Sequence, residues 1–186
     1  MRKPLALTIV VVLGFAGAIA GYLAILALMD NVIAGRSVWT EAKWPFPIDQ
    51  WGTGRAFNCK PADCGTGVVL YLRAKVGFCN CTTGVADDEE LERVGDVDIV
   101  GSQSAALGPG RPITVHWMKG RSRSYAVGGR VPSAKSALSL AFNDRCDAIV
   151  ALAVVEGDRA SAQEPAVLEF LNGDLILRWA ESTLGL

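Results

Sequence analysis

Apolar residues are concentrated at the N-terminal end of the chain. Residues 5–29 carry no charged side chain and follow the basic pair Arg2 and Lys3. As a helix this segment would reach about 37 Å, enough to cross a hydrocarbon core of ~30 Å. The pattern predicts a cytoplasmic tail and a transmembrane signal anchor over residues 1–29, with the basic pair on the cytoplasmic side. A cleavable signal peptide, cut at the small residues 18–21, is the alternative.

The next segment, residues 30–51, is rich in tryptophan and proline and predicts a juxtamembrane linker. Pro45 and Pro47 exclude a continuing helix and favour an extended path. Indole rings favour the headgroup zone of a bilayer, so Trp39 and Trp44 are predicted membrane-interface residues. The alternative is that both rings fill the core of the folded domain.

Hydrophobic patterns typical of strands dominate the first part of residues 52–186. The β-branched and aromatic run 67–75 predicts a strand, and residues 76–81 are expected to form a second extended segment. Residues 108–129 suggest a hairpin whose turn is Lys119 to Arg123. The continuous apolar run 147–155 has the length of a strand and predicts the central, buried one.

Helical signals complete the pattern. Residues 86–95 predict a short helix that begins at Asp87 or Asp88 and ends at Gly95, with its acidic residues at the positive end of the helix dipole. The C-terminal residues predict two short helices, the first beginning near Pro165. The expected fold class is α+β: one transmembrane helix, then a small mixed domain, 52–186, with an antiparallel or mixed sheet stapled by disulfides.

Composition and motifs narrow the function. The chain has 18 basic and 19 acidic residues, a net charge of −1, which argues against a nucleic-acid partner. The sequence has no dinucleotide fingerprint and no Walker loop, so neither a nucleotide nor another cofactor is predicted. His116 is the single histidine and lies in a predicted strand, where a packed or surface role is expected rather than catalysis.

Four of the five cysteines follow the spacing C-x4-C-x14-C-x-C. We expect Cys59, Cys64, Cys79 and Cys81 to form two disulfides. The α-carbons of two cysteines one residue apart in a strand are ~7 Å from each other, about the upper limit for a disulfide, so we do not expect a bond between them. The nested pairing, Cys59–Cys81 with Cys64–Cys79, fits antiparallel segments best, and the crossed pairing stays open.

The remaining cysteine and a metal alternative complete this picture. Cys146 is either a buried thiol or the partner of one of the other four, which would release a different thiol. In the metal alternative, Cys59, Cys64, Cys79 and Cys81 together hold Cu(I) or zinc as thiolates. A third hypothesis is an envelope enzyme that uses the Cys146 thiol.

Basic residues recur at alternate positions in the predicted hairpin. Lys119, Arg121 and Arg123 would share one face and form an interaction patch for anionic headgroups or an acidic partner. The acidic residues of segment 87–92 form a patch of opposite charge. A solvated turn and a solvated helix are the simpler interpretations of the two patches.

The sequence therefore predicts a membrane-anchored, extracytoplasmic accessory or interaction protein without enzymatic activity, such as a subunit or assembly factor of a membrane complex. Its partners would be the lipid bilayer and a membrane protein. The predicted location is the bacterial inner membrane, crossed once, with the N-terminus in the cytoplasm and the C-terminal domain in the periplasm. The alternative function is a soft-metal binding module.

Overall fold

The computed structural model describes residues 38–128, 134–157 and 159–186. Within these ranges, no helix is both long and apolar enough to cross a membrane. The predicted tail and signal anchor, residues 1–29, lie outside the described residues, as does the first part of the predicted linker.

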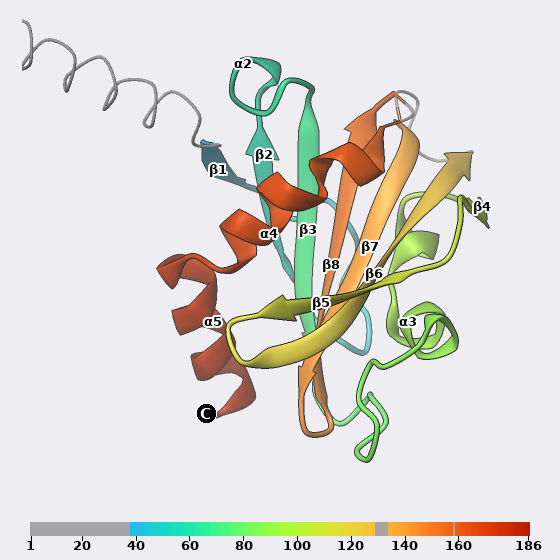
Figure 1. The fold of residues 1–186 in the computed structure, drawn as a ribbon. Helices are drawn as coiled ribbons and strands as arrows, with labels where there is room; N and C mark the ends of the chain where they lie inside the picture. The colour runs from blue at the N-terminus through green and yellow to red at the C-terminus, as the bar shows by residue number, and fades with distance from the viewer. Residues whose placement is uncertain (1–37, 129–133, 158) are drawn as a thin grey trace, which may run out of the picture. The chain divides into compact units, whose positions relative to one another are not determined.

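The described residues form an eight-stranded sheet in which every pairing is antiparallel. The strand order is β1-β2-β3-β8-β7-β6-β4, and β5 pairs with β6 beside β4 (Figure 1). The strands are β1 (Trp39–Ala42), β2 (Arg55–Cys59), β3 (Val68–Lys75), β4 (Gln103–Ala106), β5 (Arg111–Val115), β6 (Met118–Gly128), β7 (Ala134–Asp144) and β8 (Asp147–Glu156).

Helices pack on both faces of the sheet. The helices α4 (Glu164–Leu171) and α5 (Asp174–Leu184) lie over one face, and α3 (Asp88–Val94) packs on the other (Figure 1). The first face holds the main apolar core, and two smaller apolar clusters fill the second. The shorter helical elements are α2 (Pro61–Cys64), η1 (Val97–Ile99) and η2 (Ala160–Gln163).

The central strand β8 is apolar from Ala148 to Val155, and these residues are buried on both faces of the sheet. Ile149 and Ala151 contribute to the core under α4 and α5, whereas Val150 and Leu152 contribute to the clusters on the α3 face. Such burial is worth about 1.5–3 kcal/mol for each large aliphatic side chain. The prediction that residues 147–155 form the central strand is confirmed.

The expected fold class is wrong. The chain forms a mostly antiparallel sheet domain rather than a small mixed α+β domain behind a transmembrane helix, and no such helix is found in the described part of the chain. The sheet is larger than the apolar pattern indicated because several strands carry little apolar signal. β4 reads Gln-Ser-Ala-Ala and is exposed throughout, and β6 contains the polar stretch KGRSRS.

Local predictions had mixed outcomes. The strand at 67–75 and the C-terminal helix pair are confirmed, and Asp87 caps α3 by accepting a hydrogen bond from the Glu90 amide at 2.8 Å. The hairpin turn is wrong, because it lies between β5 and β6 at His116 and Trp117. The extended segment at 76–81 is also wrong, because those residues lie in the loop between β3 and α3.

Candidate functional site

The first disulfide joins Cys59, the last residue of β2, to Cys64, the last residue of α2. The Cα atoms are 6.0 Å apart and the bond closes a loop over five residues of sequence. Lys60 is extended before the helix, and Gly65 ends it in the left-handed region with φ 70°. The bond therefore closes the short connection that leaves β2.

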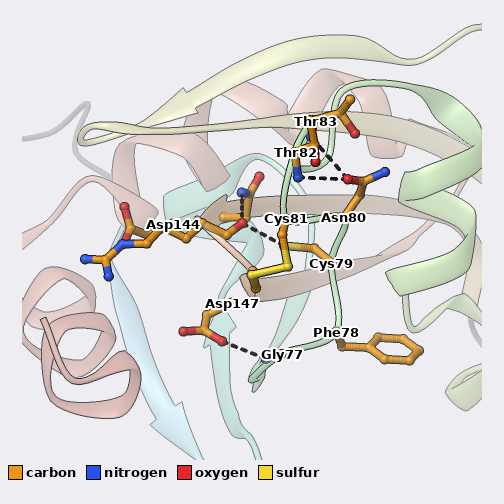
Figure 2. Close-up of a disulfide and its surroundings, with 12 residues drawn as sticks. Gly77, Phe78, Cys79, Asn80, Cys81, Thr82, Thr83, Asp144 and Asp147 are labelled. Atoms are coloured by element: carbon orange, nitrogen blue, oxygen red, sulfur yellow. Dashed lines mark hydrogen bonds and ion pairs between the residues drawn. A yellow bond between two sulfur atoms is a disulfide. The ribbon is translucent and has the colours of Figure 1, made fainter.

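The second disulfide joins Cys81, in the loop after β3, to Cys146, in the turn between β7 and β8. The sequence separation is 65 and the Cα atoms are 4.2 Å apart (Figure 2). The turn itself is tight, since Arg145 has φ 49°. A side chain reinforces the same connection, because Asp147 Oδ1 accepts a hydrogen bond from the Gly77 amide at 2.6 Å.

Cys79 is the free cysteine and is buried beside this disulfide. Its amide donates to the Cys146 carbonyl at 3.1 Å, and its thiol donates to the Arg145 carbonyl at 3.2 Å. Burial, followed by the negative charges of Glu90 and Asp147, raises the pKa of the Cys79 thiol to about 11. The thiol is therefore protonated near neutral pH, which makes it a poor nucleophile and a poor metal ligand.

These bonds correct the predicted cysteine chemistry. Both the nested and the crossed pairing are wrong, because Cys59 pairs with Cys64 and Cys81 pairs with Cys146, which leaves Cys79 free. Of the two alternatives for Cys146, the disulfide is the one that forms. Cys146 therefore has no free thiol, and the hypothesis of an enzyme that uses this thiol is wrong. Three of the four thiolates of the metal alternative are engaged in disulfides. No group of three or more His, Cys, Asp or Glu side chains in the described ranges is arranged to hold a metal ion.

The acidic run after the cysteines organises their loop. Glu90 Oε1 accepts a hydrogen bond from the Asn80 amide at 2.7 Å, and Asn80 Oδ1 in turn accepts from the amides of Thr82 and Thr83 (Figure 2). A hydrogen bond from Arg93 is the main reason that the pKa of Glu90 lies below its usual value. The acidic segment is therefore a capped helix that holds the disulfide loop in place.

The predicted basic patch is not a free surface. Arg121 pairs with Asp88, and Arg123 Nη1 lies 2.6 Å from Glu92 Oε1. The Asp88 carboxylate also accepts the Gly110 amide, and this bond, followed by the one from Arg121, lowers the pKa of Asp88. Lys119 stays exposed. The two patches of opposite charge therefore bind each other and connect α3 to β6.

A buried carboxylate that the sequence did not indicate lies at the start of α4. Glu164 Oε1 accepts a hydrogen bond from the Ser122 hydroxyl at 2.6 Å, and Oε2 pairs with Arg111. A pocket of about 290 Å³ opens beside this group. Ser122 lines this pocket, but it is only 1% exposed and its hydroxyl is engaged as the hydrogen-bond donor to Glu164. The group links β5 and β6 to α4.

A second buried ionic group lies under α3. Arg73 and Lys75, both on β3, converge on Asp96, and Arg73 Nη1 also reaches Asp49 Oδ2 at 2.6 Å. The sequence did carry a signal for this group, because two cations alternate with apolar residues at the end of a strand. Since charges are rarely buried without partners, that pattern indicates acidic partners from another segment.

The two tryptophans predicted at the membrane interface contact side chains of the domain. Trp39 stacks on Phe170 of α4 with ring centroids 4.9 Å apart, and Trp44 meets Phe46 and Tyr71 edge-on. These contacts agree with the alternative that the rings pack on the domain. Contact with lipid stays a prediction.

His116 occupies the turn between β5 and β6. Its backbone has φ 53°, and its amide donates to Asn172 Oδ1 at 2.7 Å. The ring nitrogen Nε2 is buried and has no hydrogen-bond partner in the described part of the chain. No described residue therefore binds Nε2 and positions the ring for acid–base catalysis.

Together these features define an antiparallel sheet domain with helices on both faces, stapled by two disulfides and cross-linked by internal ion pairs. No model of a known protein family matches the chain, and no curated protein matches it either.

Proposed function

We propose that this protein is a membrane-attached, extracytoplasmic interaction protein without enzymatic activity, an accessory subunit or assembly factor of a membrane complex. The observation that carries the proposal is the pair of disulfides, Cys59–Cys64 and Cys81–Cys146, in separate parts of the fold. Disulfides persist in oxidising compartments such as the bacterial periplasm and are rare in the cytosol. Attachment to a bacterial inner membrane through residues 5–29 is part of the proposal and is supported by the sequence alone.

The engagement of the polar side chains supports an interaction role. The two buried carboxylates are both bound to neighbouring side chains: Glu164 to Ser122 and Arg111, and Asp96 to Arg73 and Lys75. These bonds fix elements of the fold in place and give both carboxylates a structural role.

The location is tested by peptide mapping of the native protein under non-reducing conditions, together with reporters fused to its C-terminus. We expect both disulfides in the protein isolated from cells, and activity only from a reporter that works outside the cytoplasm. A C-terminal reporter active only in the cytosol, with reduced cysteines, would contradict the proposal.

The interaction role is tested by chemical cross-linking in intact cells before solubilisation in mild detergent. We expect the same cross-linked membrane protein in independent preparations. A strictly monomeric protein without a reproducible cross-linked partner would contradict the role while leaving the location intact.

A further inference from the structure

The open edges of the sheet differ in how well they are protected. Among the described residues, β1, β4 and β5 pair on one side only. β1 carries Glu41, which is bound by Arg55, and β5 carries Arg111 and Pro112. Charged side chains and proline on an edge strand hinder pairing with another chain. β4, which lies at the edge of the sheet (Figure 1), has neither. All four of its residues are exposed, so its side chains hinder the pairing of a further strand least.

The backbone of β4 presents hydrogen-bonding groups to this open side. The Leu107 amide donates to the Ser124 carbonyl at 2.9 Å, so residue 107 is bonded inward to β6. Bonded and non-bonded positions alternate along an antiparallel pair. Ala105 is therefore bonded inward as well, and the amides and carbonyls of Ser104 and Ala106 point outward.

The same two residues line a hollow next to the strand. Ser104 and Ala106 form one wall of a cavity of about 340 Å³, to which Leu91, Val97 and Tyr125 contribute apolar surface. In an added antiparallel strand, the residue directly opposite Ser104 or Ala106 projects its side chain to the same face. A strand that pairs with the backbone of β4 would therefore also place its side chains in the hollow.

The charged side chains around the hollow indicate which kind of segment can bind there. Glu92 and Asp98 also line it; Glu92 is 54% exposed although it binds Arg123, and Asp98 has no ion-pair partner in the described ranges. An acidic rim favours a basic segment. In a symmetric pairing of β4 with β4 of a second copy, two acidic rims would face each other, which disfavours self-association.

We propose that β4 is a docking edge to which an extended segment of a partner protein adds as an antiparallel strand. The segment has apolar residues opposite Ser104 and Ala106 and basic residues flanking them. Main-chain hydrogen bonds would supply affinity, and the hollow with its acidic rim would supply specificity, as in other cases of strand addition. The inference rests on the proposed interaction function and names its surface and the chemistry of its partner.

The test uses the full-length, isotope-labelled chain in detergent micelles and a capped peptide, Lys-Ser-Val-Ser-Val-Ser-Lys. Its valines face the hollow and its lysines face the rim when it pairs with β4. At millimolar peptide we expect slower hydrogen exchange at the Ser104 and Ala106 amides and shifted Tyr125 ring signals. The Ala105 amide, already bonded to β6, should keep its exchange rate.

Variants separate backbone pairing from side-chain effects. Ser104→Pro removes an outward amide without removing a bond to β6, and should weaken peptide binding about tenfold or more. The matched control, Ser104→Ala, keeps the amide and should bind as the parent does. Asp98→Lys should weaken binding, whereas Asp63→Lys on the distant α2 should not.

Three results would overturn the docking edge: protection at β1 or β5 instead, equal binding by Ser104→Pro and Ser104→Ala, or no response at millimolar peptide. A concentration-dependent dimer abolished by Ser104→Pro would also overturn it, in favour of a second copy. A reproducible cross-link to a partner at residues far from β4 would contradict the docking edge but would still support the interaction function.

Discussion

Arg73 and Asp96 form a bidentate ion pair in the interior, with Nε–Oδ2 at 2.5 Å and Nη2–Oδ1 at 2.6 Å. Lys75 adds a contact of 2.7 Å to Oδ1, so a single carboxylate serves two buried cations. Burial alone would lower the pKa of Arg73, but hydrogen bonds to Asp96 and Asp49 raise it above its ordinary value. The segment before η1 is thereby connected to the middle of the sheet.

Removal of this carboxylate should be costly. Asp96→Ala leaves Arg73 and Lys75 buried without their shared partner, and breaking such a pair from one side costs about 3–5 kcal/mol. Urea unfolding should show this loss of free energy. The control, Asp98→Ala, removes an exposed carboxylate two residues away and should change stability by less than ~0.5 kcal/mol. Equal effects of the two substitutions would contradict the role assigned to Asp96.

The two disulfides should contribute unequally to stability. Loop-closure entropy predicts about 2 kcal/mol for a loop of five residues and about 4 kcal/mol for one of 65. Cys81→Ser with Cys146→Ser should therefore lower the free energy of unfolding more than Cys59→Ser with Cys64→Ser. Chemical denaturation of both double variants without reductant measures the difference. The reverse order would show that strain or residual structure outweighs chain entropy.

Cys79 should be nearly inert to alkylation in the folded protein. Its pKa is raised from 9.0 to about 11, which reduces the thiolate fraction at neutral pH about a hundredfold, and burial restricts access further. Iodoacetamide labelling followed by mass spectrometry should show slow modification at pH 7 and fast modification in urea. Cys79→Ala should abolish the labelling. Labelling of the folded protein as fast as in urea would contradict the buried position.

Stability should fall in acid because several carboxylates are held in ion pairs. The pKa values of Asp49, Asp88 and Glu90 are all lowered in the folded state, chiefly by hydrogen bonds from Arg73, the Gly110 amide and Arg93 in turn. The unfolded state then binds more protons, so this stabilisation is complete above the ordinary values of 3.8 and 4.5 and is lost as the pH falls below them.

Urea unfolding at a series of pH values checks this dependence. Asp88→Asn should flatten the slope between about pH 4 and pH 2, because asparagine keeps an acceptor oxygen but does not titrate. An unchanged slope would mean that the pairs of Asp88 with Arg121 and Gly110 contribute little.

Some of the fold was predictable because its signals are local. The cap at Asp87, the helix start near Pro165 and the apolar run of β8 each depend on a few neighbouring residues. The turn at His116 was missed because the polar stretch after it resembles a turn while forming part of a long strand. Strand β4 was missed because its side chains are exposed on both faces and leave no apolar pattern.

The cysteines show the limit of such reasoning most clearly. Spacing predicted disulfides among Cys59, Cys64, Cys79 and Cys81, but Cys79 is free, because the choice of partners depends on which segments meet in space. The β7–β8 turn brings Cys146 to Cys81 across 65 residues, whereas the neighbouring Cys79 faces the core.

The sequence alone determined which segments could be strands or helices, and that sulfur chemistry would matter, because propensity, capping and composition act over short distances. Only the tertiary structure decided the pairing of sulfurs, the neutralisation of Arg121 and Arg123 by α3, and the exposure of the β4 edge. These depend on contacts between residues distant in sequence, and their energies exist only once the sheet has formed.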